Sequence, residues 1–337
     1  MVHKRSYWFA LHPDIKRPIG GVKQIHRLAE AILKSGRDAT LIQDDADFHP
    51  NWFKSNVRTI SQSHWRELTD LDPACNSLVL PETYITALSS YSPNLPTIIF
   101  NQNGAYTFGL DADIGNTKIQ HILNLYSSSY LSHVICVSRH DYNLLSAGLG
   151  LPDAKLSLII NGIESTLFKP GIHKKRQIAF MPRKNSRDSL IVQNMLSTKS
   201  WMNGWSLMPI DRCSQESVAS ILQDSLLFLS FGHPEGFGLP VAEALACGCA
   251  VVGYSGLGGR ELFTLGKKYF IVKEVAFGDW VGFVQATHEF IQAFDSRQSW
   301  LFSMLRSCSE SIRSQYNEST MQESVDLALC KHETSFS

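Results

Sequence analysis

The residues with the clearest chemical potential lie between positions 230 and 248, where a glycine-rich turn separates two glutamates. Glu235 and Glu243 stand eight positions apart, and glycines between them allow a backbone to approach a ligand closely. Pro240 suits the first turn of a helix, whose free N–H groups attract an anion such as a phosphate. Glu243 has the chemistry to accept two ribose hydroxyls, and Glu235 to hold a further polar group. Ribose, diphosphate and sugar in that order describe a nucleotide sugar.

The alternative interpretation of this segment is a glycine-rich turn that carries two solvated glutamates by chance. That interpretation is reasonable for any single glutamate or glycine, but it does not account for the whole string. We therefore predict a donor-binding segment made of Glu235, Gly236, Phe237, Gly238, Leu239 and Glu243.

Short apolar runs alternating with helical patterns are the elements that must position these residues. Strands are expected at 6–11, 39–42, 77–80, 97–100, 133–137, 156–160, 177–181, 225–230 and 250–253. Helices are expected at 22–36, from Pro240 onward and over the tail 297–331. This alternation indicates βαβ units and mainly parallel sheets, whose ligands bind at the carboxyl ends of the strands.

The strand pattern restarts after a charged linker at residues 169–176, so we predict two doubly wound α/β domains. The first is expected over residues 1–167 and the second over 168–311, with a helix at about 312–331 packing back on the first. The length of 337 residues, with 44% hydrophobic and 18% charged residues, exceeds one small domain and can supply two cores.

The string from Glu235 to Glu243 resembles the E-x7-E signature of retaining GT-B glycosyltransferases of family four (group 1). Further matches follow the family's order: Gly20-Gly21 opening the first helix, Val137-Ser138, the segment 158–170, and residues 258–261. The resemblance implies two Rossmann-like domains facing across a cleft, with the donor on the second. It also implies that Glu243 holds the ribose, that Glu235 holds the transferred sugar, and that Gly20 and Gly21 approach the donor.

A basic pair that neutralises the diphosphate is a further implication of the resemblance. Arg183 stands where the family's arginine is expected, but the family's lysine position, five residues later, is Asp188. Lys184 or Arg187 is left as the second cation, and a solvated basic loop is the alternative. Arg183, Lys184 and Glu235 are accordingly the predicted catalytic residues, and both cations are also predicted to bind the donor.

The first domain departs from the family at the end of a central strand, where similar enzymes often carry a histidine. Here the strand at 97–100 is followed by Asn101-Gln102-Asn103. Amides can bind sugar hydroxyls but cannot act as a general base near neutral pH. We place these three residues on the acceptor side, with a plain Asn-Gly turn as the alternative. Catalysis is then expected to depend on stabilising the leaving group, with the donor's β-phosphate taking the acceptor proton.

Two Asp-Ala-Asp tripeptides, at 45–47 and 111–113, spell the DxD motif that holds a divalent metal in GT-A glycosyltransferases. The tripeptide is short and common, so we predict no metal and no cofactor, the nucleotide sugar being a substrate. The glycines at 256–259 lack the full GxGxxG spacing and are a weak dinucleotide fingerprint.

Charge and cysteine content restrict the partners and the location. Thirty-one Lys plus Arg balance thirty-one Asp plus Glu, which argues against nucleic acid as a partner. Seven cysteines without a CxxC pair favour free thiols in a reducing compartment. No apolar run approaches the ~18 residues of a membrane span. We expect a cytoplasmic protein, with peripheral contact at the inner membrane face through the basic residues 173–176.

The function expected from these residues and the resemblance is metal-independent transfer of a sugar, with retention, from a nucleotide-sugar donor to a hydroxyl acceptor. A cell-surface polysaccharide or a lipid-linked glycan precursor is the expected acceptor. Two alternatives remain: a UDP-sugar epimerase of the same architecture, and a non-catalytic GT-B subunit that binds a sugar nucleotide or a glycan.

Overall fold

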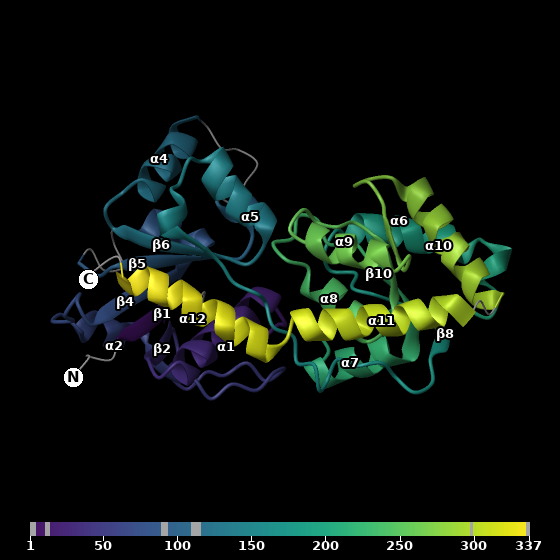
Figure 1. Ribbon diagram of the computed structural model, residues 1–337, viewed down its shortest axis with the longest axis horizontal. Helices are drawn as coiled ribbons and strands as arrows, with labels where there is room; N and C mark the ends of the chain where they lie inside the picture. The colour runs from purple at the N-terminus through teal and green to yellow at the C-terminus, as the bar shows by residue number, and fades with distance from the viewer. Residues whose placement is uncertain (1–4, 11–13, 89–93, 109–115, 297–298, 335–337) are drawn as a thin grey trace. The chain divides into compact units, whose positions relative to one another are not determined.

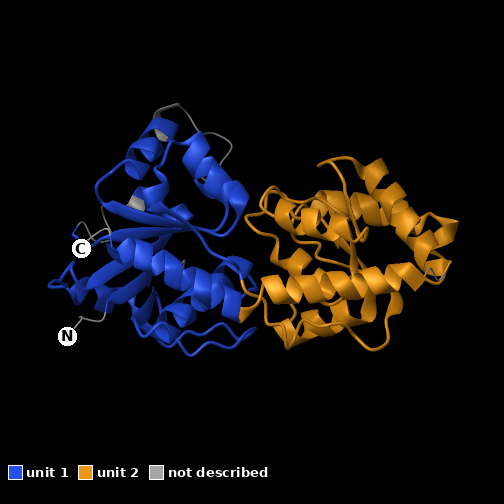
Figure 2. Cartoon of the chain, viewed as in Figure 1, with its two compact units in different colours: residues 1–161, 319–337 blue, residues 162–318 orange. Residues whose placement is uncertain are grey.

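The computed structural model describes residues 5–10, 14–88, 94–108, 116–296 and 299–334. The chain forms two compact units, shown in blue and orange in Figure 2: unit 1 comprises residues 1–161 and 319–337, and unit 2 residues 162–318. The chain therefore enters unit 2 after Asn161, a few residues before the boundary expected near 168, and returns to unit 1 at Ser319.

Unit 1 is built on a seven-stranded parallel sheet in the order β3-β2-β1-β4-β5-β6-β7 (Figure 1). The strands are β1 (Ser6–Ala10), β2 (Asp38–Gln43), β3 (Arg58–Ser61), β4 (Asn76–Pro81), β5 (Thr97–Asn101), β6 (Leu131–Cys136) and β7 (Leu156–Leu158). The order reverses beside β1, because β2 lies on one side of it and β4 on the other. The carboxyl ends of β1 and β4 therefore flank a switch point, where ligands of such sheets bind.

The α-helices of unit 1 are α1 (Gly20–Lys34), α2 (Gln62–Glu67), α4 (Asn116–Tyr126), α5 (Arg139–Asn143) and α12 (Glu318–Thr334). Short helical turns complete the connections: η1 (Glu82–Ala87), η2 (Gly104–Tyr106), η3 (Leu144–Gly148) and η4 (Asp153–Lys155). Apolar residues of α1 keep helical spacing, and Ile25, Leu28 and Ile32 are buried, as the sequence pattern predicts.

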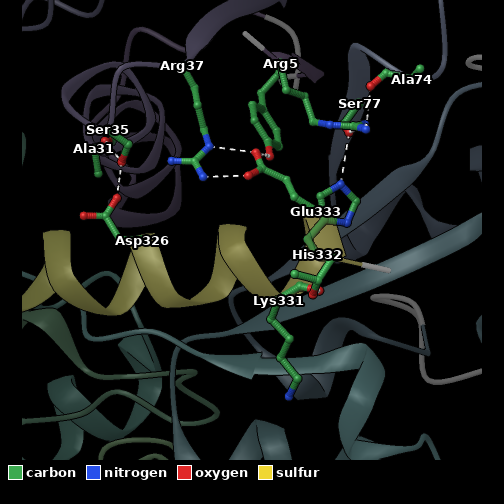
Figure 3. Close-up of polar contacts among 12 residues, drawn as sticks. Arg5, Ala31, Ser35, Arg37, Ala74, Ser77, Asp326, Lys331, His332 and Glu333 are labelled. Carbon is green, nitrogen blue, oxygen red and sulfur yellow. Dashed lines mark hydrogen bonds and ion pairs between the residues drawn. The ribbon is translucent and has the colours of Figure 1, made fainter. Parts of the chain in front are cut away.

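Helix α12 joins unit 1 through buried apolar side chains and a polar network (Figure 3). The Glu333 carboxylate pairs with Arg37 at 2.6 Å and accepts the Tyr7 hydroxyl at 2.7 Å. Nε2 of His332 lies 3.0 Å from the Ser77 hydroxyl. Burial lowers the pKa of His332 to about 3, so this histidine is neutral in the folded protein. These contacts join the last described helix to β1, to β4 and to Arg37, the residue before β2.

Unit 2 contains a five-stranded parallel sheet in the order β12-β11-β10-β8-β9. Its strands are β8 (Lys175–Phe180), β9 (Ser206–Pro209), β10 (Ser225–Ser230), β11 (Ala250–Gly253) and β12 (Val272–Glu274). Its helices are α6 (Ser186–Ser197), α7 (Gln215–Asp224), α8 (Leu239–Ala246), α9 (Arg260–Lys268), α10 (Trp280–Asp295) and α11 (Ser299–Gln315), with the turn η5 (Ser200–Met202). The order reverses between β8 and β10. The prediction of two doubly wound parallel α/β domains is confirmed.

The expected single helix over 297–331 is two helices, α11 and α12, which separate at Tyr316-Asn317. No glycine or proline marks this break. The Asn317 side chain instead donates to the carbonyls of Arg313 (3.1 Å) and Ser314 (2.9 Å) and so caps the end of α11.

Candidate functional site

The loops after β8 and β10 meet at the switch point of unit 2, and one asparagine joins them. The Asn185 side chain donates to the carbonyls of Phe231 (2.7 Å) and His233 (2.8 Å). Asn185 precedes α6 with φ near 49°, a left-handed conformation that asparagine tolerates better than most residues. The two loops that carry the predicted cations and Glu235 are therefore held together.

Lys184 and Glu235 form the charged centre of this junction. The Lys184 ammonium lies 2.8 Å from the Glu235 carboxylate and also donates to the Pro234 carbonyl at 3.3 Å. Both side chains are partly buried, which strengthens their attraction relative to an exposed pair. Of the two cations that the sequence left open, the structure therefore brings Lys184 to Glu235, whereas Arg187 is exposed.

Arg183 takes no part in this ion pair. It is exposed, and it forms no ion pair or side-chain hydrogen bond with any residue that the structure describes. An arginine in this state keeps all five N–H donors for an anionic ligand.

Asp188, at the family's lysine position, faces the interior of unit 2. Its carboxylate accepts the hydroxyl of Tyr254 at 2.8 Å, and the Tyr254 oxygen in turn accepts the backbone N–H of Gly278 at 3.3 Å. Burial, reinforced by the hydrogen bond to Asp188, raises the pKa of Tyr254 well above its usual range. This position therefore anchors the start of α6 to the loop that follows β11 and supplies no cation.

Glu235 is held in place by the turn that follows β11. Its backbone N–H donates to the Gly256 carbonyl at 2.7 Å, and its carbonyl accepts the N–H of Gly258 at 3.0 Å. A Cβ atom at Gly258 would lie 1.8 Å from the carbonyl oxygen of Gly236, and one at Gly256 would lie 2.6 Å from Cβ of Glu235. The glycines at 256–259 are thus a packing surface for the Glu235 loop, which explains a run that matches no dinucleotide fingerprint.

The signature helix α8 begins directly after this loop. Gly238 precedes it with φ of 87°, a conformation that favours glycine, and Pro240 occupies its first turn. Glu243 is buried one turn further on. The ring of Phe237 is also buried, 5.4 Å from the ring of Tyr316, so its side chain packs the loop onto the rest of unit 2.

The sequence analysis did not single out His233, in the loop after β10, or Phe277, in the loop after β12. The imidazole of His233 stacks on Phe277 with the ring centroids 4.3 Å apart, and Phe277 is more than half exposed. Burial, followed by the charge of Arg260, lowers the pKa of His233, and Glu235 opposes the shift. The signal that could have indicated His233 is its place two residues before Glu235.

The predicted residues of unit 1 gather at the carboxyl ends of its strands. Gly20 and Gly21 open α1, and a Cβ atom at Gly21 would lie 3.4 Å from Oε1 of Gln102. Asn101 is buried and accepts the Thr107 hydroxyl at 3.2 Å, while the Asn103 side chain accepts the N–H of Ala105 at 3.1 Å.

The asparagines on either side of Gln102 therefore fix the local backbone, in keeping with the Asn-Gly turn alternative. Gln102 is the partly exposed amide of the three, and it lies beside the start of α1.

The remaining predicted features are placed as follows. The carboxylate of Asp45 accepts the N–H of Asp47 within its own turn, and the second DxD tripeptide, at 111–113, lies outside the described residues. Within the described ranges, no group of three metal-binding side chains comes together. None of the helices described is both long and apolar enough to cross a bilayer.

The basic run at 173–176 is engaged within unit 2. Lys174 donates to the carbonyls of Leu222 and Ser225, Lys175 pairs with Asp224 at 2.6 Å, and Arg176 pairs with Asp295 at 3.0 Å. The surface that we predicted for peripheral membrane contact thus has its three long cationic side chains in internal contacts.

Comparison with known proteins agrees with this architecture. Residues 207–296 match the sequence model of the family described as "Glycosyl transferases group 1". An alpha-1,6-glucosyltransferase of Actinobacillus pleuropneumoniae serotype 7 (strain AP76) is 30% identical over 189 residues, which are 55% of this chain and 51% of that protein. The chain thus spans about half the length of the curated relative that it matches.

Among solved structures, sucrose-phosphate synthase of Thermosynechococcus elongatus superposes with a TM-score of 0.71 at 14% identity, covering 99% of this chain and 100% of that one. Anabaena HepE in complex with UDP-glucose superposes with a TM-score of 0.68 at 13% identity, covering 96% of this chain and 99% of HepE. A mutant of S. aureus TarM, in complex with Fondaparinux, alpha-GlcNAc-glycerol and UDP, superposes with a TM-score of 0.73 at 8% identity. This superposition covers 98% of this chain and 99% of TarM. The chain therefore has the GT-B fold, and its residues 207–296 match the group 1 glycosyl transferases.

Proposed function

We propose that this protein is a glycosyltransferase that moves a sugar from a nucleotide-sugar donor to a hydroxyl acceptor. The observation that carries the proposal is the Lys184–Glu235 pair, which lies at the switch point of the unit 2 sheet just before α8. Glu235 and α8 belong to the segment that matches the group 1 family. An exposed arginine, a lysine paired with a glutamate, and a helix N-terminus together suit a diphosphate joined to a sugar.

The proposed chemistry is stabilisation of the departing nucleoside diphosphate. Arg183, Lys184 and the N–H groups at the start of α8 neutralise the charge that develops on the phosphate oxygens, a large term in such reactions. Glu243 holds the ribose and Glu235 the hydroxyls of the transferred sugar. The positive charge of Arg183, of Lys184 and of the N-terminus of α8 neutralises the diphosphate, as a divalent metal ion does in DxD enzymes. Reaction with retention, in which the donor's phosphate oxygen takes the acceptor proton, completes the proposal.

UDP-glucose is the first donor to test. The curated relative is described as an alpha-1,6-glucosyltransferase, and HepE was crystallised with UDP-glucose. A glycan with a free primary hydroxyl, within a cell-surface polysaccharide or a lipid-linked precursor, is the proposed acceptor. Octyl α-D-glucopyranoside presents this hydroxyl on one sugar and serves as the probe.

The first experiment measures thermal stabilisation of the purified protein by UDP, GDP, ADP and UDP-glucose in the presence of EDTA. UDP release from UDP-glucose is then followed with and without octyl α-D-glucopyranoside, and the anomer of the product is determined by NMR. Glu235→Ala is expected to remain folded and to lose most of the transfer. Stabilisation by UDP without any UDP release would favour the non-catalytic subunit, and interconversion of UDP-sugars without an acceptor would favour the epimerase.

A further inference from the structure

A buried carboxylate lies at the carboxyl end of β4, in unit 1, and has no part in the donor chemistry proposed above. Glu82 is only 4% exposed, and its Oε2 accepts the backbone N–H of Gln102 at 3.1 Å. No cationic side chain among the described residues pairs with it. A buried carboxylate without a cation is costly, so a structural role in an apolar core is a poor explanation for a glutamate here.

The segment that Glu82 contacts is shaped from several sides. Side-chain bonds within the segment fix Asn101 and Asn103, as described above. Gly104 fits closely, because a Cβ atom there would lie 2.7 Å from Leu144 and 2.9 Å from the carboxylate of Asp141. At Gln102 the backbone N–H is held by the Glu82 carboxylate. Glu82 thus restrains the backbone of Gln102, the residue of the three whose side chain is partly exposed.

The place of this contact in the fold gives it a functional meaning. Glu82 follows β4, Gln102 follows β5, and Gly21 opens the helix that follows β1. These segments flank the switch point of the unit 1 sheet, where such sheets bind ligands. The Gln102 side chain lies against Gly21, at the glycine opening of α1.

We propose that Glu82 is a positioning residue for the acceptor side of the enzyme. By holding the backbone of Gln102, Glu82 keeps the side-chain amide of Gln102 available to an acceptor hydroxyl beside Gly21. The inference rests on the proposed glycosyltransferase function and adds to it a residue that the donor site does not contain. Glu82 itself does not touch the acceptor.

The position of Gln102 is also sensitive to pH. Burial raises the pKa of Glu82 to about 7, the charge of Asp141 adds to the shift, and the N–H of Gln102 opposes it. Tyr126 and Cys136 also face this carboxyl group, and burial raises the pKa of each, so both are neutral near pH 7. An ionised carboxylate is a stronger acceptor than a neutral carboxyl group. Gln102 is therefore held more firmly above pH 7 than below it.

Hydrogen exchange of the full-length chain tests the positioning directly and needs no acceptor. Peptides that cover residues 98–108 are compared at pH 6 and pH 8, after correction for intrinsic exchange. In the wild type, we expect the backbone amide of Gln102 to be about tenfold more protected at pH 8 than at pH 6. This factor corresponds to the difference in strength between a hydrogen bond to a charged acceptor and one to a neutral acceptor. Glu82→Gln is expected to show equal protection at both pH values. Equal protection of the Gln102 backbone amide in the wild type and in Glu82→Gln at pH 8 would overturn the proposal.

Kinetics with UDP-glucose and octyl α-D-glucopyranoside link the same residue to the reaction. Glu82→Gln should raise the KM for the acceptor about tenfold and leave the affinity for UDP unchanged. Glu67→Gln, which changes an exposed carboxylate of the same unit, is the matched control. If the wild type does not turn over UDP-glucose, the proposed function fails, whereas the exchange result still decides whether Glu82 positions Gln102.

Discussion

Replacement of Gly258 by alanine tests whether the turn after β11 holds Glu235 in its working position. Gly258 does not adopt a positive φ, so alanine meets no backbone strain there. The added Cβ would lie 1.8 Å from the carbonyl oxygen of Gly236 and 2.7 Å from that of Glu235. Both opposing atoms belong to the backbone and cannot turn aside as a side-chain tip can.

The size of the effect follows from these distances. Real Cβ contacts do not fall below about 3.0 Å, so the two backbones must separate by roughly 1.2 Å at Gly236. A displacement of about 1 Å at a reacting group costs on the order of 100-fold in rate. Overpacking of this kind costs ~1–3 kcal/mol, which lowers the melting temperature of a domain of this size by roughly 3–10 °C.

The assay is UDP release from UDP-glucose, measured beside a thermal melt of the same preparation. Gly148→Ala is the control, because a Cβ atom there would lie 3.4 Å from the flexible tip of Leu144. We expect Gly258→Ala to lose about 100-fold in kcat/KM and to melt earlier, and the control to do neither. Gly258→Ala with wild-type turnover and an unchanged melt would refute the claim that this backbone contact positions Glu235.

Three further predictions follow from the same structure. Arg183→Ala should weaken UDP binding about tenfold or more without changing the melting temperature, because Arg183 is exposed and has no side-chain partner among the residues that the structure describes. Titration calorimetry measures the affinity for UDP, and an affinity equal to that of the wild type would show that Arg183 does not contact the diphosphate. Burial lowers the pKa of His332 to about 3 and that of His133 to about 4, so the stability that depends on their neutral forms is complete above pH ~6.5 and declines as the pH falls towards 4. His332→Phe should flatten this decline in urea unfolding, and an unchanged profile would assign it to other groups. EDTA should leave UDP-glucose turnover unchanged, whereas a loss restored by added Mg²⁺ or Mn²⁺ would contradict the metal-independent mechanism.

The sequence pattern predicts the central strands of both sheets and misses strands at their edges. Those near the centre, such as β5 and β10, are mostly apolar and buried along their whole length. The strands that the pattern misses are β3, β9 and β12, each at one end of a sheet. Edge strands are partly exposed and mixed in composition, as Arg58-Thr59-Ile60-Ser61 in β3 illustrates, so their apolar signal is weak.

The segment from Glu235 to Glu243 could be chosen as a candidate site because its signal is local, with glycines, a proline and two glutamates within nine consecutive positions. The choice between Lys184 and Arg187 could not, because it depends on which side chain the start of α6 directs towards Glu235. Glu82 stands two residues after the strand predicted at 77–80, and that position was its only signal. Its burial against the backbone of Gln102 required the register of β4 and β5.

The chain passes from unit 1 into unit 2 and then returns to unit 1, and this path determines the order in which the two units are completed during synthesis. Unit 2 is continuous, so its 162–318 segment is complete before the ribosome has synthesised α12. Until then, Arg37 and Tyr7 lack the Glu333 carboxylate, and Ser77 lacks its contact with His332. Domains generally fold as units during synthesis. The unit that begins first is therefore the last to be finished, and a chain released after residue 318 should contain a folded unit 2 and an incomplete unit 1.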